Sequence, residues 1–116
     1  MTHLRRAPIL ARSFVALAPS IRAVTTRYTV HRFRRSEIES LAPDVAGCYA
    51  LYSGDICVFV GSGNLRRRLL AHFEGDIYCI TVHRPTRWFE YECEDPETEA
   101  RRLIRELRPR CNPRLD

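Results

Sequence analysis

At 116 residues the chain is long enough for one small domain and too short for a second of ordinary size. Its formal charge of +5 comes from 19 arginines, with no lysine, against 14 acidic residues. Residues 1–36 carry eight of these arginines and no acid, whereas residues 37–116 carry eleven arginines and all 14 acids. The positive charge therefore belongs to the N-terminal third, and it does not by itself identify the folded part as a nucleic-acid-binding surface.

Residues 1–26 form a basic segment that is rich in Arg, Ser, Thr and Ala. Pro8 and Arg12 interrupt its apolar residues, so no run reaches the roughly 18 apolar residues that a membrane span needs. We therefore expect neither a secretory signal nor a membrane partner. The composition resembles that of an organelle transit peptide, while a disordered extension or a misread upstream start codon would also explain it. The expected location is the cytoplasm, or the mitochondrion if the segment is a transit peptide.

Residues 27–33 interleave apolar and aromatic residues with His and Arg, which is typical of an edge strand with a charged outer face. This strand would end a basic tail, residues 1–35, that is otherwise expected to be disordered or transit-like. Ser36 and Glu39 then have the spacing of a capping box, which predicts one short helical turn. The folded domain is accordingly expected over residues 36–116.

The next segment predicts a hairpin followed by a helix. The runs "CYALY" (48–52) and "ICVFV" (56–60) are rich in strand formers, and a Ser-Gly-Asp turn joins them. Gly61 ends the second run, and Asn64 is a good N-cap for a helix that reaches Phe73.

Two more elements follow. The run "WFEYEC" (88–93) alternates apolar residues with Glu90 and Glu92, which predicts a third strand with one wet face. A last helix is expected from Pro96, with apolar residues at helical spacing until Pro109. The order strand, strand, helix, strand, helix indicates an α/β fold around a small sheet.

The five cysteines are widely spaced, odd in number and free of any C-x-x-C pair, so the sequence favours neither a zinc site nor a full disulfide framework. We expect them to be small core residues in a reducing compartment. They are Cys48, Cys57, Cys79, Cys93 and Cys111.

Four motifs follow one another between residues 47 and 112: "GCY" with Gly47 and Tyr49, "FVG" with Phe59 and Gly61, "NLRRRLLAHF", and "LIRELRPRCN". Together they resemble the GIY-YIG nuclease superfamily, which includes the N-terminal domain of the bacterial excision-repair nuclease and several homing endonucleases. The resemblance implies an α/β fold with a small three-stranded antiparallel sheet flanked by helices. It also implies hydrolysis of a DNA phosphodiester with Mg²⁺ or Mn²⁺.

The resemblance implies a role for each matching residue. Tyr49, otherwise equally well explained as a core residue, matches the tyrosine that assists attack by water, because a phenol near a metal ion can lose its proton below its usual pKa of about 10. Arg68 matches the arginine that stabilises the phosphate, whereas Arg67 is expected to be solvated. His72, one helical turn after Arg68, would bond a phosphate oxygen or act as a second base. Glu99 would hold the metal ion.

Two departures from the family pattern concern catalysis. Phe59 stands where the second motif has a tyrosine, so that hydroxyl is absent. Ala100 stands at the expected position of the metal ligand, and Glu99 lies one residue earlier, on the flank of the apolar stripe of its helix. Either the register is shifted and Glu99 reaches the metal, or the ligand is lost and Glu99 pairs with Arg102. Asn112 matches the closing asparagine of the family and is expected to bond backbone groups at the chain end.

These observations leave two functions open. The first is a small metal-dependent DNA endonuclease, possessing weak activity and serving a process such as DNA repair, with duplex or branched DNA as its partner. The second is a catalytically degenerate module that keeps the fold and the Arg68 surface and binds nucleic acid without cleaving it. A protein-interaction domain with solvated arginines is a third, less favoured interpretation.

Overall fold

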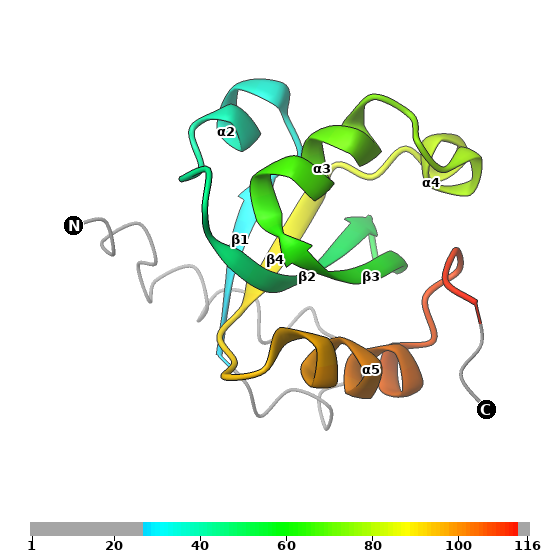
Figure 1. The fold of residues 1–116 in the computed structure, drawn as a ribbon. Helices are drawn as coiled ribbons and strands as arrows, with labels where there is room; N and C mark the ends of the chain where they lie inside the picture. The colour runs from blue at the N-terminus through cyan, green and yellow to red at the C-terminus, as the bar shows by residue number, and fades with distance from the viewer. Residues whose placement is uncertain (1–26, 114–116) are drawn as a thin grey trace.

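The computed structural model describes residues 27–113, so the expectations for residues 1–26 lie outside the described part of the chain. The described residues form strands and helices in mixed order (Figure 1). In chain order they are β1 (Tyr28–Arg32), α2 (Arg35–Glu39), β2 (Ala46–Ser53), β3 (Ile56–Asn64), α3 (Leu65–Phe73), α4 (Tyr78–His83), β4 (Arg87–Tyr91) and α5 (Pro96–Leu107).

The strands form one sheet in the order β1-β4-β2-β3, and every neighbouring pair is antiparallel. The α/β class expected from the sequence is confirmed. The three-stranded sheet that the resemblance implies is wrong, because the edge strand expected at residues 27–33 is present as β1 and pairs along its whole length with β4 as a fourth strand. In the centre of the sheet Tyr49 lies opposite Gly61 of β3 on one side and Glu90 of β4 on the other.

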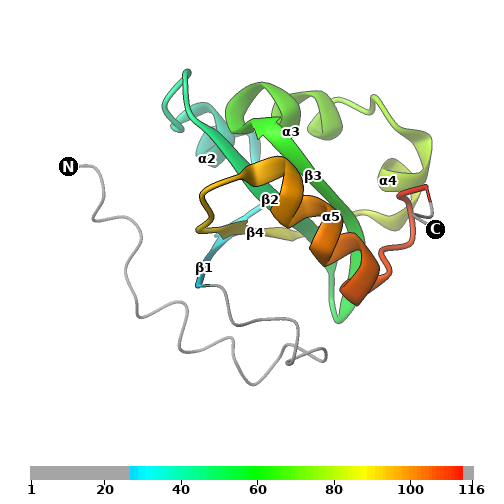
Figure 2. The ribbon, with the colours of Figure 1, turned by 60° about the horizontal axis from the view of Figure 1, so that its bottom comes forward.

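Helices cover both faces of the sheet (Figures 1 and 2). We call the side covered by α2, α3 and α4 the α3 face, and the side covered by α5 the α5 face. Because successive strand residues point to opposite faces, the same strands contribute to two separate cores. The core on the α3 face comprises Ile38, Tyr49, Leu51, Val58, Phe59, Leu65, Leu69, Ile80 and Trp88. The core on the α5 face comprises Tyr28, Cys48, Ala50, Tyr52, Cys57, Val60, Phe89, Tyr91, Ala100 and Leu103.

The two long helices begin where the sequence predicts. The side chain of Asn64 accepts a hydrogen bond of 2.9 Å from the backbone N–H of Arg67, which satisfies one of the free donors at the start of α3. Pro96 occupies the first turn of α5, where its missing N–H costs no helical hydrogen bond.

The two short helices differ from expectation. The capping box predicted from Ser36 is wrong, because α2 already begins at Arg35 and no side chain caps it. The helix α4 was not predicted, since its exposed residues Tyr78 and Val82 obscure any amphipathic pattern. It is fixed instead by Ile80, which is buried in the core on the α3 face.

The C-terminal segment lies along the outer edge of β3. The backbone N–H of Arg110 donates to the carbonyl of Cys57 at 3.1 Å, and that of Cys111 donates to Val58 at 2.9 Å. The Asn112 side chain accepts from the N–H of Val60 and donates to its carbonyl, both at 2.8 Å. These bonds satisfy edge groups that would otherwise be open to pairing with another chain.

The fold also pairs two of the cysteines. Cys79 of α4 and Cys111 of the C-terminal segment form a disulfide, so the expectation that all five are unpaired core residues is wrong for these two. They lie 32 residues apart in sequence, and only the folded chain brings them together. Cys48 and Cys57 are buried thiols as expected, and Cys93 is a partly exposed one.

Candidate functional site

Three polar side chains form a hydrogen-bonded chain under α3. Tyr49 projects from β2 into the α3 face and is fully buried. Its hydroxyl lies 2.7 Å from Nε2 of His72, and Nδ1 of the same ring lies 2.9 Å from a carboxylate oxygen of Asp76. The carboxylate can only accept, so Nδ1 carries the proton and, in the neutral ring, Nε2 accepts from the tyrosine. Tyr49 is thus linked through His72 to a partly exposed acid at the surface.

Glycines make room for this arrangement. A side chain at Gly61, directly across the hairpin, would overlap the hydroxyl of Tyr49 and come within 2.6 Å of its Cζ atom. Gly63 has a positive φ of 126°, which favours glycine, and a Cβ there would lie 3.6 Å from Cδ of Arg68. The Arg68 side chain therefore lies over Gly63 at the end of β3, close enough to Tyr49 for its charge to act on the phenol.

Burial and a nearby charge shift the pKa of Tyr49 in opposite directions. Burial raises the pKa of the phenol to about 12, although the nearby positive charge of Arg68 acts in the opposite direction. Burial also lowers the pKa of His72, and Asp76 only partly offsets this effect. Both shifts favour the neutral tyrosine hydrogen-bonded to the neutral imidazole.

Arg68 has an unused donor at this site. Its Nε atom is buried and has no hydrogen-bond partner among the described residues. A buried donor without a partner is costly, and a planar guanidinium fork matches the oxygens of a phosphate or carboxylate. The neighbouring Arg67 is exposed, in agreement with its expected position on the outer side of α3.

The motif residues surround this cluster. Phe59 packs edge-on against the His72 ring, with 4.9 Å between ring centroids, so it buttresses the histidine without adding a hydrogen bond. A β-bulge in the hairpin leaves Val58 unpaired and directs it and Phe59 into the same core. Gly47 lies opposite Gly63, and a Cβ there would lie 3.0 Å from Cδ1 of Leu65. Asn112 acts at the chain end, as described above.

Glu99 is placed differently. It lies on α5, and its carboxylate accepts two hydrogen bonds from Arg102, at 2.7 and 3.3 Å. Burial raises the pKa values of Cys48 and Cys93, which belong to the core of the α5 face or pack against it, and the nearby charge of Glu99 raises them further. Ala100 is buried in the same core. The structure therefore brings Tyr49, Arg68 and His72 together and leaves Glu99 on the helix that covers the opposite face.

These positions do not fit a Mg²⁺ or Mn²⁺ site beside Tyr49. Such ions prefer several oxygen ligands in strict geometry, whereas Glu99 is already bound to Arg102 and Ala100 offers no ligand. Within residues 27–113 the one group of three side chains close enough to share a metal ion is Cys79, His83 and Cys111. Its sulfur and nitrogen donors are unlike those that Mg²⁺ selects.

Two acids near Tyr49 were missed by the sequence analysis. Asp76 follows His72 by four residues, and this spacing was the available signal, although α3 already ends at Phe73. Glu90 was assigned to a wet strand face, which is wrong: only 7% of its surface is exposed, and it lies 3.1 Å from Nε2 of His31. The signal was Trp88, which has the same alternation and indicates a covered face.

The chain matches no protein-family model, no curated protein and no solved structure. Among the helices of the described residues, none has the length and apolar character needed to cross a membrane. The cluster is therefore interpreted from its own geometry and chemistry.

Proposed function

We propose that this chain is a GIY-YIG-like nucleic-acid-binding module that holds a backbone phosphate of DNA at Arg68. The observation that carries the proposal is the buried, unpartnered Nε of Arg68 beside the hydroxyl of Tyr49. A phosphate placed there would accept from the guanidinium and satisfy that donor. Duplex or branched DNA offers such phosphates along its whole length.

Binding is favoured over cleavage by the protonation state of the cluster. Removing the proton of a phenol whose pKa is about 12 costs about 7 kcal/mol at pH 7, since each pKa unit corresponds to about 1.4 kcal/mol. The lowered pKa of His72 makes this ring a weaker proton acceptor. In this state Tyr49 and His72 act mainly as hydrogen-bonding groups that position Arg68 and an incoming phosphate.

A weak DNA endonuclease that uses Mg²⁺ or Mn²⁺ is the second candidate. It is favoured by the hydrogen-bonded order of Tyr49, His72 and Asp76, because a tyrosine linked to an imidazole and a carboxylate has a route for its proton. A binding module has no need of such a route. The position of Glu99 on α5, paired with Arg102, is the observation against this candidate.

The proposal is tested by comparing two neighbouring arginines. Affinity is measured by fluorescence anisotropy with a labelled duplex and a labelled branched DNA, for the full chain and for Arg68→Ala and Arg67→Ala. Losing a charge-assisted contact of roughly 1.5–3 kcal/mol should weaken binding by Arg68→Ala about tenfold or more. Arg67→Ala should change it less than about threefold, since surface charges away from the contact act only by screened attraction. Equal losses in the two variants, or none, would overturn the proposal.

A nicking assay separates the two candidates. Supercoiled plasmid is incubated with the full chain in Mg²⁺, in Mn²⁺ and in chelator. The binding module leaves the plasmid intact in all three, while an endonuclease nicks it only with the metal and loses this activity in Arg68→Ala. In the endonuclease case, Phe59→Tyr should raise the nicking rate, because it returns a hydroxyl next to His72.

A further inference from the structure

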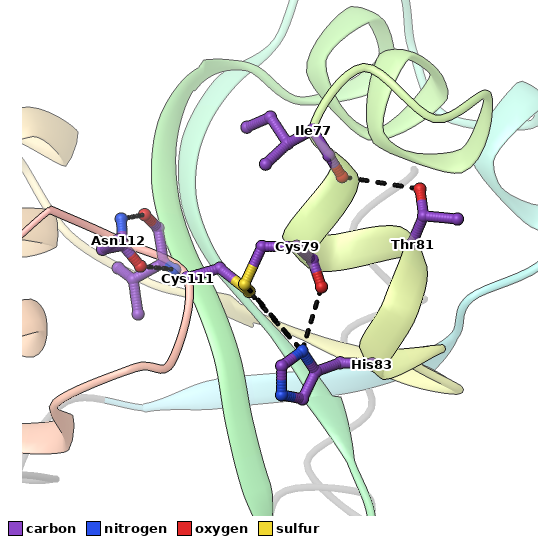
Figure 3. The surroundings of a disulfide bond; sticks show 7 residues. Ile77, Cys79, Thr81, His83, Cys111 and Asn112 are labelled. Carbon is purple, nitrogen blue, oxygen red and sulfur yellow. Dashed lines mark hydrogen bonds between the residues drawn. A yellow bond between two sulfur atoms is a disulfide. The ribbon is translucent and has the colours of Figure 1, made fainter.

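A second cluster of side chains lies where α4 meets the C-terminal segment (Figure 3). Cys79 and His83 lie one helical turn apart on α4, and Cys111 comes from the segment that follows α5. Nδ1 of His83 lies 3.9 Å from the sulfur of Cys79 and 3.7 Å from the sulfur of Cys111. All three side chains are partly exposed, so solutes can reach them.

The spacing of these atoms is close to that of a zinc site. With bond lengths of about 2.3 Å to sulfur and 2.0–2.1 Å to nitrogen, a tetrahedral Zn²⁺ ion places a sulfur and a nitrogen about 3.6 Å apart and two sulfurs about 3.8 Å apart. The two observed sulfur to Nδ1 distances, 3.9 and 3.7 Å, already approach the first value. Only the two bonded sulfurs must separate.

The backbone would keep the three ligands near one another after the disulfide opens. Cys79 and His83 belong to the same helix, which Ile80 holds in the core. Cys111 is held by its own backbone bond to Val58 at 2.9 Å and by the two bonds of the next residue, Asn112, to β3. The disulfide therefore joins two segments that other contacts already hold in place.

We propose that, when the disulfide is reduced, Cys79, His83 and Cys111 form a binding site for a thiophilic divalent cation of the Zn²⁺ class. Thiolate and imidazole ligands select such ions over Mg²⁺ and Ca²⁺. Three protein ligands leave the fourth tetrahedral position to water or another small ligand. The same two sulfurs make the disulfide and the metal site mutually exclusive, and the proposal does not depend on the function assigned to Arg68.

The exchange between the two states balances with a dithiol reductant. The dithiol passes two electrons and two protons to the disulfide, the S–S bond breaks to give two thiols, and the reductant becomes a disulfide itself. Binding of Zn²⁺ then displaces the two thiol protons into solvent. Nδ1 of His83, which donates to the carbonyl of Cys79 at 2.9 Å in the disulfide form, must take the other tautomer, with its proton on Nε2.

The experiment titrates Co²⁺, a coloured substitute for Zn²⁺, into the full chain under anaerobic conditions. Reduced protein should take up one equivalent and show the thiolate-to-cobalt charge-transfer band together with the visible bands of a tetrahedral ion. One equivalent of Zn²⁺ should then displace the colour. Protein with the intact disulfide should show neither band, and this comparison needs no variant that might fail to fold.

Three variants locate the site. Removing a group that supports a metal ligand lowers metal affinity roughly tenfold, and removing a ligand itself should cost at least as much. Cys111→Ser and His83→Ala should therefore each bind Co²⁺ at least roughly tenfold more weakly than the parent. The matched control is Cys93→Ser, which removes a partly exposed free thiol outside the cluster and should bind like the parent. Reduced parent protein without the bands, unchanged affinity in His83→Ala, or lost affinity in Cys93→Ser would each overturn the proposal.

Discussion

The two faces of the sheet differ in chemistry although the same strands build both. On the α3 face, Tyr49 and Glu90 lie side by side on neighbouring strands, and His72 descends from α3 to meet the tyrosine. On the α5 face, the neighbouring residues Cys48 and Tyr91 pack with Leu103 in a core of apolar side chains. One face combines packing with a hydrogen-bonded cluster, and the other serves packing.

This difference explains why the residues of a spacing that resembles a nuclease motif do not all meet on one face of the sheet. Strand residues change face at every step, and a helix covers a sheet with only one stripe of its surface. In α5, Ala100 belongs to the stripe that packs on the sheet, while Glu99 lies beside this stripe and forms an ion pair with Arg102. A carboxylate on α5 would therefore have to reach around the edge of β3 to approach Tyr49, whereas Asp76 and Glu90 already lie on the α3 face.

The largest effect is expected from placing a carboxylate in the core of the α5 face. Ala100→Glu would bury a charge, or a protonated acid without a partner, among Cys48, Val60 and Leu103. We expect a loss of about 3 kcal/mol in the free energy of unfolding. Urea denaturation followed by circular dichroism measures this loss.

Arg101→Glu is the matched control, because it puts the same residue on the exposed side of α5. It should cost less than about 1 kcal/mol, mainly from the lost pair with Glu97 and the repulsion that replaces it. If Ala100→Glu were instead as stable as the parent and acquired nicking that depends on Mg²⁺, the contrast between the two faces would not hold.

The next largest effect is expected from filling the space beside Tyr49 on the α3 face. Gly61→Ala places a methyl group against the phenol and should destabilise the fold by about 1–3 kcal/mol, as overpacking does. It should also weaken DNA binding, because the displaced phenol shifts His72 and the neighbouring Arg68. Urea denaturation and anisotropy measure the two effects.

The control for this change is Gly54→Ala in the hairpin turn. Gly54 has a φ of 60° and no atom near the position of a Cβ, so the variant bears only the backbone cost of about 1 kcal/mol. Its DNA affinity should equal that of the parent. If the two variants lost affinity alike, the effect of Gly61→Ala would come from general destabilisation.

The parts of the fold that the sequence predicts are those with local signals. The hairpin between residues 48 and 60 has its turn chemistry, α3 has the Asn64 cap, and α5 has Pro96 and an apolar stripe. The helix α4 has no such signal, since a tertiary contact of Ile80 fixes it. The disulfide is likewise a product of the tertiary fold, because its two cysteines come from segments with no local relation.

The candidate site likewise has parts that local sequence patterns predict and parts that depend on the tertiary fold. Arg68 and His72 lie one helical turn apart, and Tyr49 faces the same side as the buried stripe of α3, so their meeting follows from periodicity. The burial of Glu90 depends on whether helices cover that face of β4, and the apolar Trp88, two residues earlier on the same face, was the one signal for this in the sequence. The outcome for Glu99 depends on which side of the sheet α5 takes, and this is a matter of chain topology.

A smaller effect is expected from pH. The pKa of His72 is lowered in the folded chain, so between that pKa and the unfolded value of about 6.5 the unfolded chain binds more protons. The contribution of His72 to the free energy of unfolding should therefore be fully present above about pH 7 and decline as the pH falls below this value. Urea denaturation between pH 7.5 and 5 measures this decline, and His72→Gln should flatten it.

Asp76→Asn tests the same link between His72 and acid stability, with a change expected in the opposite direction. The carboxylate of Asp76 raises the pKa of His72, so its removal should lower that pKa further and make the decline with falling pH steeper. A decline that is unchanged in both variants would mean that groups outside the hydrogen-bonded chain control the acid sensitivity of the fold.

The smallest effect is expected from Glu99, and it decides whether the two faces are chemically separate. Glu99→Ala removes one partly exposed ion pair with Arg102, which contributes at most about 1 kcal/mol to stability. DNA affinity and any nicking should be unchanged, and Arg102→Ala should behave in the same way because it breaks the same pair. If Glu99→Ala alone abolished nicking that depends on Mg²⁺ or Mn²⁺, the carboxylate would have to leave Arg102 and reach the α3 face past Gly61 and Gly63. That route has no side chain on either glycine to block it, so a metal-soaked crystal of the parent with bound DNA would show the rearranged Glu99 directly.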